Sequence, residues 1–238
     1  MLLPLNLAMT PTEIAAADIL PEQIAWMACH FSPAGQGLVN LPIHLPEGAI
    51  LILDDSVPCQ GHSADVILQT LDELVIQFRC NSLLLDFQRP ANKETMSLVQ
   101  TLLRALPCPV AVPPEYAEKL PCPVFLPPPP LHLPLGKYLQ PWAGREIWLE
   151  AALCQQTITV SPDGTTVTPT DTTEYPNSGF FDKNLCCRYL TKIETSRITF
   201  TLFDTPETLQ CKLDQAQSLG VTRAVGLYQE LGTFLTGK

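Results

Sequence analysis

The sequence predicts an α/β fold, a (β/α)8 barrel of the TIM type that is complete or lacks part of its helical layer. Short apolar runs alternate with amphipathic helical segments, which is typical of a parallel sheet covered by helices. Proline residues gather at the ends of these runs, as expected where strands exit into loops. The length of 238 residues fits one such domain, which we expect to span residues 1–238.

The number of apolar runs favours a barrel over its nearest alternative, an open doubly wound sheet. No glycine-rich phosphate loop follows any run, which removes support from the nucleotide-binding versions of that sheet. The number of expected strands reaches eight only if the first apolar run, Leu2–Leu7, forms a strand. The expected strands are Leu2–Leu7, Ile24–His30, Ala49–Asp54, Ser82–Phe87, Val110–Val112, Val124–Leu126, Glu146–Leu153 and Ala224–Tyr228.

Four helices are marked by local signals at their ends. A capping threonine followed by proline opens the segments at Thr10 and at Thr205, and Gly220 ends the second of these. Two further segments carry apolar stripes at helical spacing, one that starts at Ser63 and one over 92–106.

A different pattern occupies residues 155–203, where we expect an antiparallel β insert before the last strand. Thr157–Thr168 alternates between apolar and polar residues around Asp163-Gly164, which is a hairpin signal. A polar loop is expected from there to Ser196, and Arg197–Phe203 alternates again.

Composition narrows the function classes. The net charge is −10 and the 14 basic residues form no cluster, so nucleic acid and anionic membranes are poor partners. No apolar run reaches the ~18 residues of a membrane span, and Met1–Ala8 lacks the features of a signal peptide. Nine scattered cysteines, with the adjacent pair Cys186-Cys187 unsuited to a disulfide, predict free thiols in a reducing compartment. We therefore expect a soluble cytoplasmic protein.

Polar residues end two of the expected strands, where barrels present their catalytic groups. They are Asp54-Asp55 and Asp86 with Gln88, and a further candidate acid, Glu150, lies within the seventh expected strand. Clustered carboxylates raise one another's pKa and can serve as acids. The alternatives are that Asp54 or Asp55 caps the following turn, and that Glu150 points outward to a basic residue.

The stretch Asn81–Pro90 resembles the signature of glycoside hydrolase family 18, D-G-x-D-x-D-x-E followed by an aromatic residue and proline. Asp86 matches the last Asp, whereas Gln88 stands where the proton-donating Glu belongs. The stretch Phe203–Leu213, with Gly220–Gly232, resembles that family's closing helix and eighth strand. The resemblance implies the barrel fold and an amino-sugar glycan or peptidoglycan fragment as partner, in a bacterial setting with spore association as an alternative to the cytoplasm.

The departures from this pattern weigh against the family's reaction. A glutamine has no proton to donate near neutral pH, so Gln88 cannot act as a general acid. Asn81 and Leu84 replace the first two Asp of the pattern, and no Tyr-Asp pair follows Val124–Pro127. We expect an inactive relative that binds saccharide or acts as a scaffold. The alternatives are an active glycosidase that uses Asp54, Asp55 or Glu150, and a partner-binding barrel without a sugar site.

Aromatic and imidazole side chains complete the set of candidates. Tyr228 and Tyr116 are expected to stack against sugar rings, Tyr228 because it lies at a strand end near the position of the family's sugar-stacking Trp. His30 ends the second strand and is a candidate substrate contact. We expect no cofactor and no metal, because the His and Cys residues show no ligand spacing.

Overall fold

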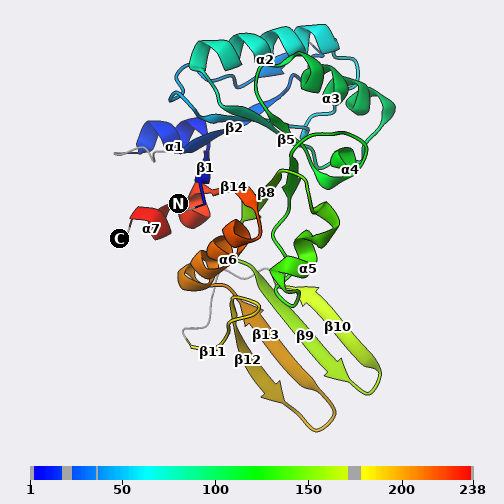
Figure 1. Cartoon of the computed structure of the whole chain (residues 1–238), viewed down its shortest axis with the longest axis vertical. Coiled ribbons are helices and arrows are strands. Elements are labelled where there is room, and N and C mark those ends of the chain that lie inside the picture. Colours follow the sequence, from blue (N-terminus) through cyan, green and yellow to red (C-terminus); the bar gives the residue numbers. More distant parts are fainter. Residues whose placement is uncertain (1–2, 18–22, 36, 171–177, 237–238) are drawn as a thin grey trace.

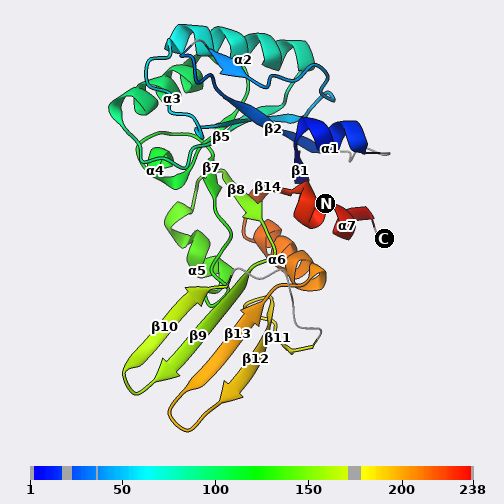
Figure 2. The same cartoon turned by 180° about the vertical axis from the view of Figure 1, so that it is seen from behind.

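The computed structural model describes residues 3–17, 23–35, 37–170 and 178–236, with side chains described as far as Gly232. It contains a parallel barrel and a separate antiparallel sheet (Figure 1). Helices α2, α3 and α4 lie together on one side of the barrel, and the antiparallel sheet extends away from the opposite side (Figures 1 and 2).

Eight parallel strands form the barrel, in the order β6-β5-β4-β2-β1-β14-β8-β7. The ring closes where Val112, directly after β6, forms a parallel bridge with Val124 of β7. The short strand β3 (Leu38–Val39) pairs antiparallel with β2. The strands are β1 (Leu5–Met9), β2 (Ile24–Phe31), β4 (Ile50–Asp54), β5 (Ser82–Asp86), β6 (Val110–Ala111), β7 (Val124–Leu126), β8 (Ile147–Ala151) and β14 (Val221–Leu227).

This arrangement confirms the predicted barrel and all eight predicted strands. The first expected strand, Leu2–Leu7, is present but lies slightly later, at Leu5–Met9. It is enclosed by parallel pairing with β2 on one side and β14 on the other, so the chain's first and last strands close the barrel together.

Two apolar layers pack against the barrel wall. An inner layer fills the barrel with side chains from all eight strands, namely Ala8, Ala25, Ile50, Ile52, Leu84, Ala111, Phe125, Trp148 and Val225. A larger layer lies between the strands and the surrounding helices. Residues that alternate along one strand belong to alternate layers, so the inner layer identifies which strand residues face the barrel axis.

Local signals define the helices as the sequence predicts. Thr10 and Thr205 both make reciprocal capping boxes, and Gly220 follows the second helix with φ 88°. Ser63 starts α2 without a side-chain cap. The helices are α1 (Pro11–Ala16), α2 (Ala64–Phe78), α3 (Lys93–Ala105), α4 (Pro114–Ala117), α5 (Leu135–Leu139), α6 (Pro206–Ser218) and α7 (Tyr228–Thr236), with one 3-10 turn at Gln140–Trp142.

The antiparallel sheet lies between β8 and α6 in the chain, in the order β10-β9-β13-β12-β11. Its strands are β9 (Gln155–Ser161), β10 (Gly164–Pro169), β11 (Phe180–Asp182), β12 (Cys187–Ile193) and β13 (Ile198–Phe203). The β9–β10 hairpin agrees with the sequence, although its turn is centred on Pro162-Asp163 and Gly164 is already paired with Ser161.

Two expectations about this part of the chain are wrong. The segment expected as polar loop up to Ser196 contains β11 and β12, which pair with each other, and β12 also pairs with β13. Cys186, expected to be a free thiol, forms a disulfide with Cys211 of α6 at a Cα–Cα distance of 5.7 Å. The other seven cysteines are free. In the described part of the chain, no helix has the length and apolar character that crossing a bilayer requires.

Candidate functional site at the barrel mouth

Three carboxylates predicted from the sequence face the barrel mouth. Asp54 follows the inward-facing Ile52 by two residues, Asp86 follows Leu84, and Glu150 follows Trp148. Residues two apart on a strand share a face, so all three lie above the inner apolar layer at the C-terminal ends of β4, β5 and β8. The barrel mouth therefore gathers three carboxylates from three different strands.

Asp86 is held by Gln88, the residue that aligns with the acid position of the pattern described above. The Gln88 side-chain amide donates a hydrogen bond to Asp86 Oδ1. Burial raises the pKa of Asp86, and the nearby charges of Asp54 and Asp55 add to that rise, while the Gln88 hydrogen bond opposes it. Gln88 thus stabilises a carboxylate instead of supplying a proton.

Glu150 has the most perturbed carboxyl at the mouth. Burial, with contributions from Asp86 and then Glu230, raises its pKa from 4.5 to about 7. Asp86 and Glu150 both follow inward-facing residues, Leu84 on β5 and Trp148 on β8, so both carboxyls face the barrel mouth. Glu150 forms no salt bridge among those found in the described residues. It points inward, and it is half protonated near neutral pH.

Asp54 and His30 stand next to Asp86 on neighbouring strands. The register pairs His30 with Asp54 and Asp54 with Asp86, which places the three at one level of the barrel. Asp54 Oδ1 accepts a hydrogen bond from the Ser56 backbone at 2.8 Å, so it also caps its turn. The His30 ring lies 2.9 Å from the Phe31 carbonyl and 3.1 Å from the Asn40 amide, which fixes its orientation.

Asp55 is placed differently from the expectation that it is a catalytic candidate. Its side chain is only 2% exposed and accepts hydrogen bonds from the backbone N–H groups of Gln88 (2.8 Å) and Arg89 (3.0 Å). The Arg89 guanidinium donates in turn to the Asp55 carbonyl at 2.8 Å. Asp55 therefore holds the turn after β5 and positions Gln88.

Two aromatic candidates do not face the mouth. Tyr116 is 1% exposed and packs edge-on against Phe87, so neither of its ring faces is open to a sugar. Tyr228 packs into the outer apolar layer, with its ring against Gly232. The inward position at the end of β14 belongs to Leu227, which is in register with the inward-facing Ala8.

A different tyrosine reaches the mouth from α5. The Tyr138 hydroxyl donates a hydrogen bond to the carbonyl of Pro127, directly after β7, at 2.8 Å. Burial and the charge of Glu150 raise the pKa of Tyr138 to about 12, so it remains a neutral phenol beside that carboxyl. Sequence reasoning missed this residue because it comes from a helix and not from a strand end.

A buried ion pair holds the segment that follows Glu150. Lys212 of α6 donates to both oxygens of Asp204 at 2.6 and 2.7 Å, and the two side chains are 8% and 0% exposed. Asp204 also accepts a hydrogen bond from the Cys154 backbone, and Glu230 accepts one from the Leu153 backbone. These contacts fix the exit from β8, and Asp204 and Lys212 belong to the stretch that carries the family resemblance.

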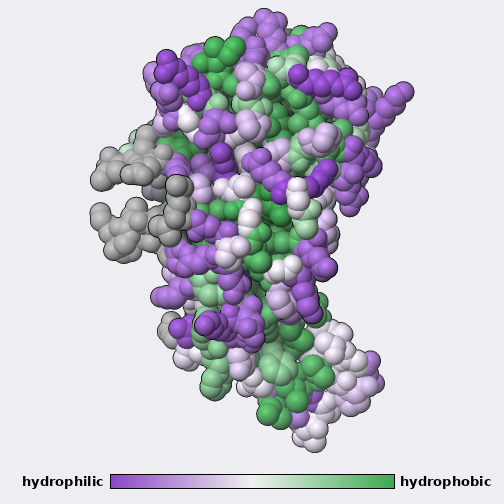
Figure 3. All heavy atoms as spheres, in the orientation of Figure 1, coloured by the Kyte–Doolittle hydropathy of each residue, from purple (hydrophilic) through white to green (hydrophobic). Residues whose placement is uncertain are grey.

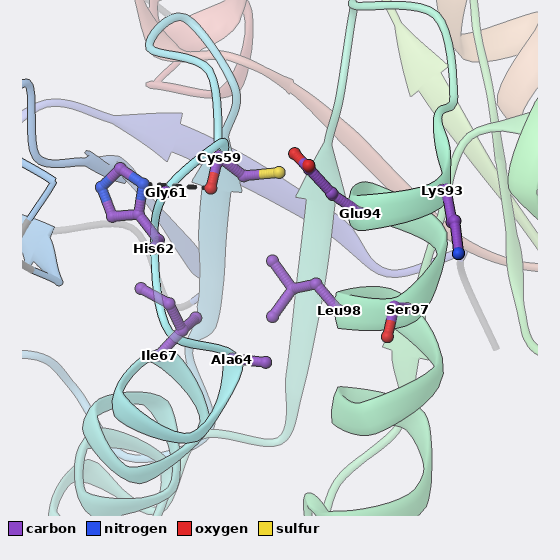
Figure 4. Close-up of a pocket in the computed structure, with 9 residues that line it drawn as sticks. All are labelled: Cys59, Gly61, His62, Ala64, Ile67, Lys93, Glu94, Ser97 and Leu98. Carbon is purple, nitrogen blue, oxygen red and sulfur yellow. Dashed lines mark hydrogen bonds between the residues drawn. The ribbon is translucent and has the colours of Figure 1, made fainter.

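A separate cavity of about 400 Å³ lies outside the barrel between the N-terminal turns of α2 and α3 (Figure 4). The Cys59 thiol points into it toward Glu94 and Leu98, while the His62 ring turns away to the Cys59 carbonyl. Its lining includes none of the mouth carboxylates. Within the described ranges, no three His, Cys, Asp or Glu side chains are grouped so as to hold a metal ion.

Comparison with known proteins shows solved structures with a similar barrel fold. No protein-family model matches the sequence, and no curated protein is significantly similar to it. The spore cortex-lytic enzyme SleL of Bacillus cereus matches with a TM-score of 0.54 at 10% identity, over 94% of this chain and 70% of its own. A glycoside hydrolase family 18 N-acetylglucosaminidase from Paenibacillus barengoltzii matches with a TM-score of 0.57 at 11% identity, over 94% of each chain.

A third solved structure extends the comparison beyond bacteria. The family 18 chitinase of Cycas revoluta, in complex with (GlcNAc)3, matches with a TM-score of 0.56 at 10% identity, over 98% of both chains. The resemblance in fold to family 18 enzymes, predicted from Asn81–Pro90 and Phe203–Leu213, is therefore confirmed. At these identities the likeness concerns the fold, and the chemistry of the mouth has to be argued from its own residues.

Proposed function

We propose that the chain binds an N-acetylglucosamine-containing glycan at the barrel mouth and does not hydrolyse it by the mechanism of family 18. The observation that carries this proposal is the hydrogen bond from Gln88 to Asp86. An amide at the acid's position cannot protonate a leaving oxygen. The same amide and the carboxylates around it are suited to hydrogen-bonding sugar hydroxyl and acetamido groups.

The mouth has the chemistry of a saccharide site in other respects. Asp54, Asp86 and Glu150 offer hydrogen-bond acceptors. The phenol of Tyr138 and the amide of Gln88 can each donate and accept hydrogen bonds. The comparison structures act on or contain glycans, which supports the choice of ligand. The acidic mouth disfavours polyanionic ligands, so neutral amino-sugar chains fit better than charged ones.

Isothermal titration with N-acetylglucosamine oligosaccharides and peptidoglycan fragments tests the proposal. We expect saturable binding to the wild type and loss of about tenfold or more in affinity in Asp86→Ala. Asp163→Ala, on the exposed β9–β10 turn, is the matched control and should bind like the wild type. Absence of binding by the wild type would favour a barrel that serves only as a scaffold.

A second function, an active glycoside hydrolase, is favoured by one specific observation. Burial raises the pKa of Glu150 to about 7, so the mouth that contains Asp86 also holds a carboxyl able to carry a proton near neutral pH. A carboxyl of that kind is what acid catalysis of glycoside cleavage requires. Turnover of an aryl N-acetylglucosaminide that Glu150→Gln abolishes would establish this function over non-hydrolytic binding.

A further inference from the structure

The antiparallel sheet has one apolar face, which we call face A, and it is open at the end far from the barrel. Cross-strand pairing places Val167, Ile158 and Phe200 in one row of this face. Val160, Ile198 and Ile193 form the next row. Four of these side chains are exposed, Val167 at 40%, Val160 at 39%, Ile198 at 37% and Ile193 at 76%. Figure 3 shows hydrophobic side chains gathered over this end of the molecule.

The end of face A nearest the barrel is covered by a loop residue, and the far end has no such cover among the described residues. At the covered end Leu131, from the loop after β7, packs with Cys187 and Leu202 as a small buried cluster. The two exposed rows continue this cluster outward along the same strands. A contiguous exposed apolar face on a soluble protein usually marks a contact with a partner.

The edge strand β10 borders the two rows and has an open side. All six of its residues are exposed, and in both ribbon views no other element lies beside it (Figures 1 and 2). Thr170, just past β10, donates its backbone N–H to Gln155 of β9, so the even-numbered residues of this strand face β9. The backbone groups of Thr165 and Val167 therefore point outward. No described group accepts a hydrogen bond from the backbone N–H of either residue.

Charge also distinguishes this region from the rest of the chain. Strands β9, β10 and β13 contain no Asp, Glu, Lys or Arg, although the whole chain has a net charge of −10. Edge strands that stay unpaired usually carry a charge that repels another strand. Like-charge repulsion between two copies would therefore act between the barrels and not between the uncharged strands β9, β10 and β13 of the two copies.

We propose that this edge joins the same edge of a second copy of the chain and so extends face A across both copies, with the two β10 strands antiparallel about a two-fold axis through Thr166. In this register Thr165 lies opposite the second copy's Val167 and exchanges two backbone hydrogen bonds with it, and the symmetric pair does the same. Both side chains lie on face A, so the row Phe200, Ile158, Val167 continues into the second copy's Thr165, Val160 and Ile198. The two acidic barrels lie at opposite ends of the joined sheet.

Analytical ultracentrifugation of the full chain at low to tens of micromolar concentration tests the dimer. We expect the wild type to sediment as a dimer that dissociates on dilution, and Val167→Lys to shift it to monomer by at least tenfold in the dissociation constant. Ile76→Lys, an equal change at an exposed apolar residue of α2, should leave the dimer intact. A wild type that stays monomeric throughout, or a Val167→Lys variant that still dimerises, overturns the proposal.

The register has its own test, which does not depend on the strength of association. A cysteine at position 166 would face its own copy across a non-hydrogen-bonded pair, at a Cα separation of about 4.5–5.5 Å that a disulfide spans. Thr166→Cys should therefore form a covalent dimer on mild oxidation, and Thr168→Cys should not, because its symmetry mate lies further along the strand. Equal crosslinking of both variants would contradict this register, and association with an unrelated protein in place of a second copy would contradict the choice of partner.

Discussion

At the scale of single residues, Glu150 contributes the most unusual property of the barrel mouth. Its pKa of about 7 means that the folded protein holds a proton there which the unfolded chain, with an ordinary value of 4.5, has already lost. A carboxyl whose folded pKa is raised stabilises the fold less as pH rises. The free energy of unfolding should therefore fall between about pH 4.5 and pH 7 on account of this group.

Glu150→Gln should remove that dependence. The variant cannot ionise, so we expect it to gain about 2 kcal/mol relative to the wild type at pH 8, after allowance for solvent screening, and little at pH 4. Urea unfolding of both proteins at the two pH values measures the difference. A gain that is the same at pH 4 and pH 8 would mean that Glu150 ionises normally.

Gln88 is the residue on which the proposed binding without hydrolysis depends. We expect Gln88→Glu to create no efficient glycosidase, because general acid catalysis gives its ~10²–10⁴-fold only when the reacting oxygen is held in place. The buried Leu84 stands where the pattern has a second carboxylate, so the introduced acid lacks that support. Release of an activated aryl glycoside is the assay, with Gln60→Glu, an exposed change, as control. Turnover by Gln88→Glu far above that of the wild type and of the Gln60→Glu control would show that the rest of the site is intact.

Asp55 stabilises the site without contacting the mouth. Asp55→Ala leaves the backbone N–H groups of Gln88 and Arg89 without their acceptor inside the protein, which should cost about 3 kcal/mol of unfolding free energy. Asp54→Ala is the natural control, because its half-buried side chain accepts one backbone hydrogen bond and should cost about 1 kcal/mol or less. Chemical denaturation distinguishes the two, and equal costs would contradict the assigned role of Asp55.

At the scale of secondary-structure elements, the junction of β8, β13 and α6 depends on the buried Asp204–Lys212 pair. Lys212→Met leaves the Asp204 carboxylate buried without its counter-charge, and we expect a loss of about 3–5 kcal/mol. The double variant Asp204→Asn, Lys212→Met should recover part of that loss, because no isolated charge remains. Thermal and urea unfolding measure both, with Gln210→Ala on the exposed side of α6 as control. A single variant as stable as the wild type would contradict this account.

The elements that the sequence predicts well are those fixed by local chemistry. Buried parallel strands are short apolar runs, and capping boxes join residues three apart, so both are visible in sequence. Strand β12 was missed because Arg188, Thr191 and Lys192 interrupt its apolar pattern, and β11 was missed because it has only three residues and pairs with β12 alone. The Cys186–Cys211 disulfide spans 25 residues and depends on how the insert folds onto α6.

The location of the candidate site could be predicted from the sequence, but the role of each residue in it was harder to predict. The strand ends identified Asp54, Asp86 and Glu150, but which neighbour faces inward depends on where each strand begins. Asp55 and Asp54 are adjacent and point to opposite sides, and the same parity turns Tyr228 outward and Leu227 inward. Tyr138 could not be found from strand patterns, because α5 supplies it.

At the scale of the whole molecule, the barrel and the antiparallel sheet divide the surface between two kinds of contact. The barrel mouth gathers carboxylates, a phenol and an amide, which suit a neutral polyhydroxylated ligand. The antiparallel sheet carries an uncharged edge and an apolar face, which suit a second copy of the chain. Because the joined sheet would keep the barrels apart, saccharide binding and association should be independent, and Val167→Lys should bind glycan like the wild type.

The central claim, binding without hydrolysis, is tested most directly by titrating the wild type with an N-acetylglucosamine tetrasaccharide and then recovering that ligand for mass spectrometry. We predict saturable heat of binding, weakened by Asp86→Ala, with the tetrasaccharide recovered intact after prolonged incubation at pH 5 and pH 7. Recovery of shorter oligosaccharides in the wild-type sample, absent from the Glu150→Gln sample, would contradict the claim and identify the mouth as an active glycosidase.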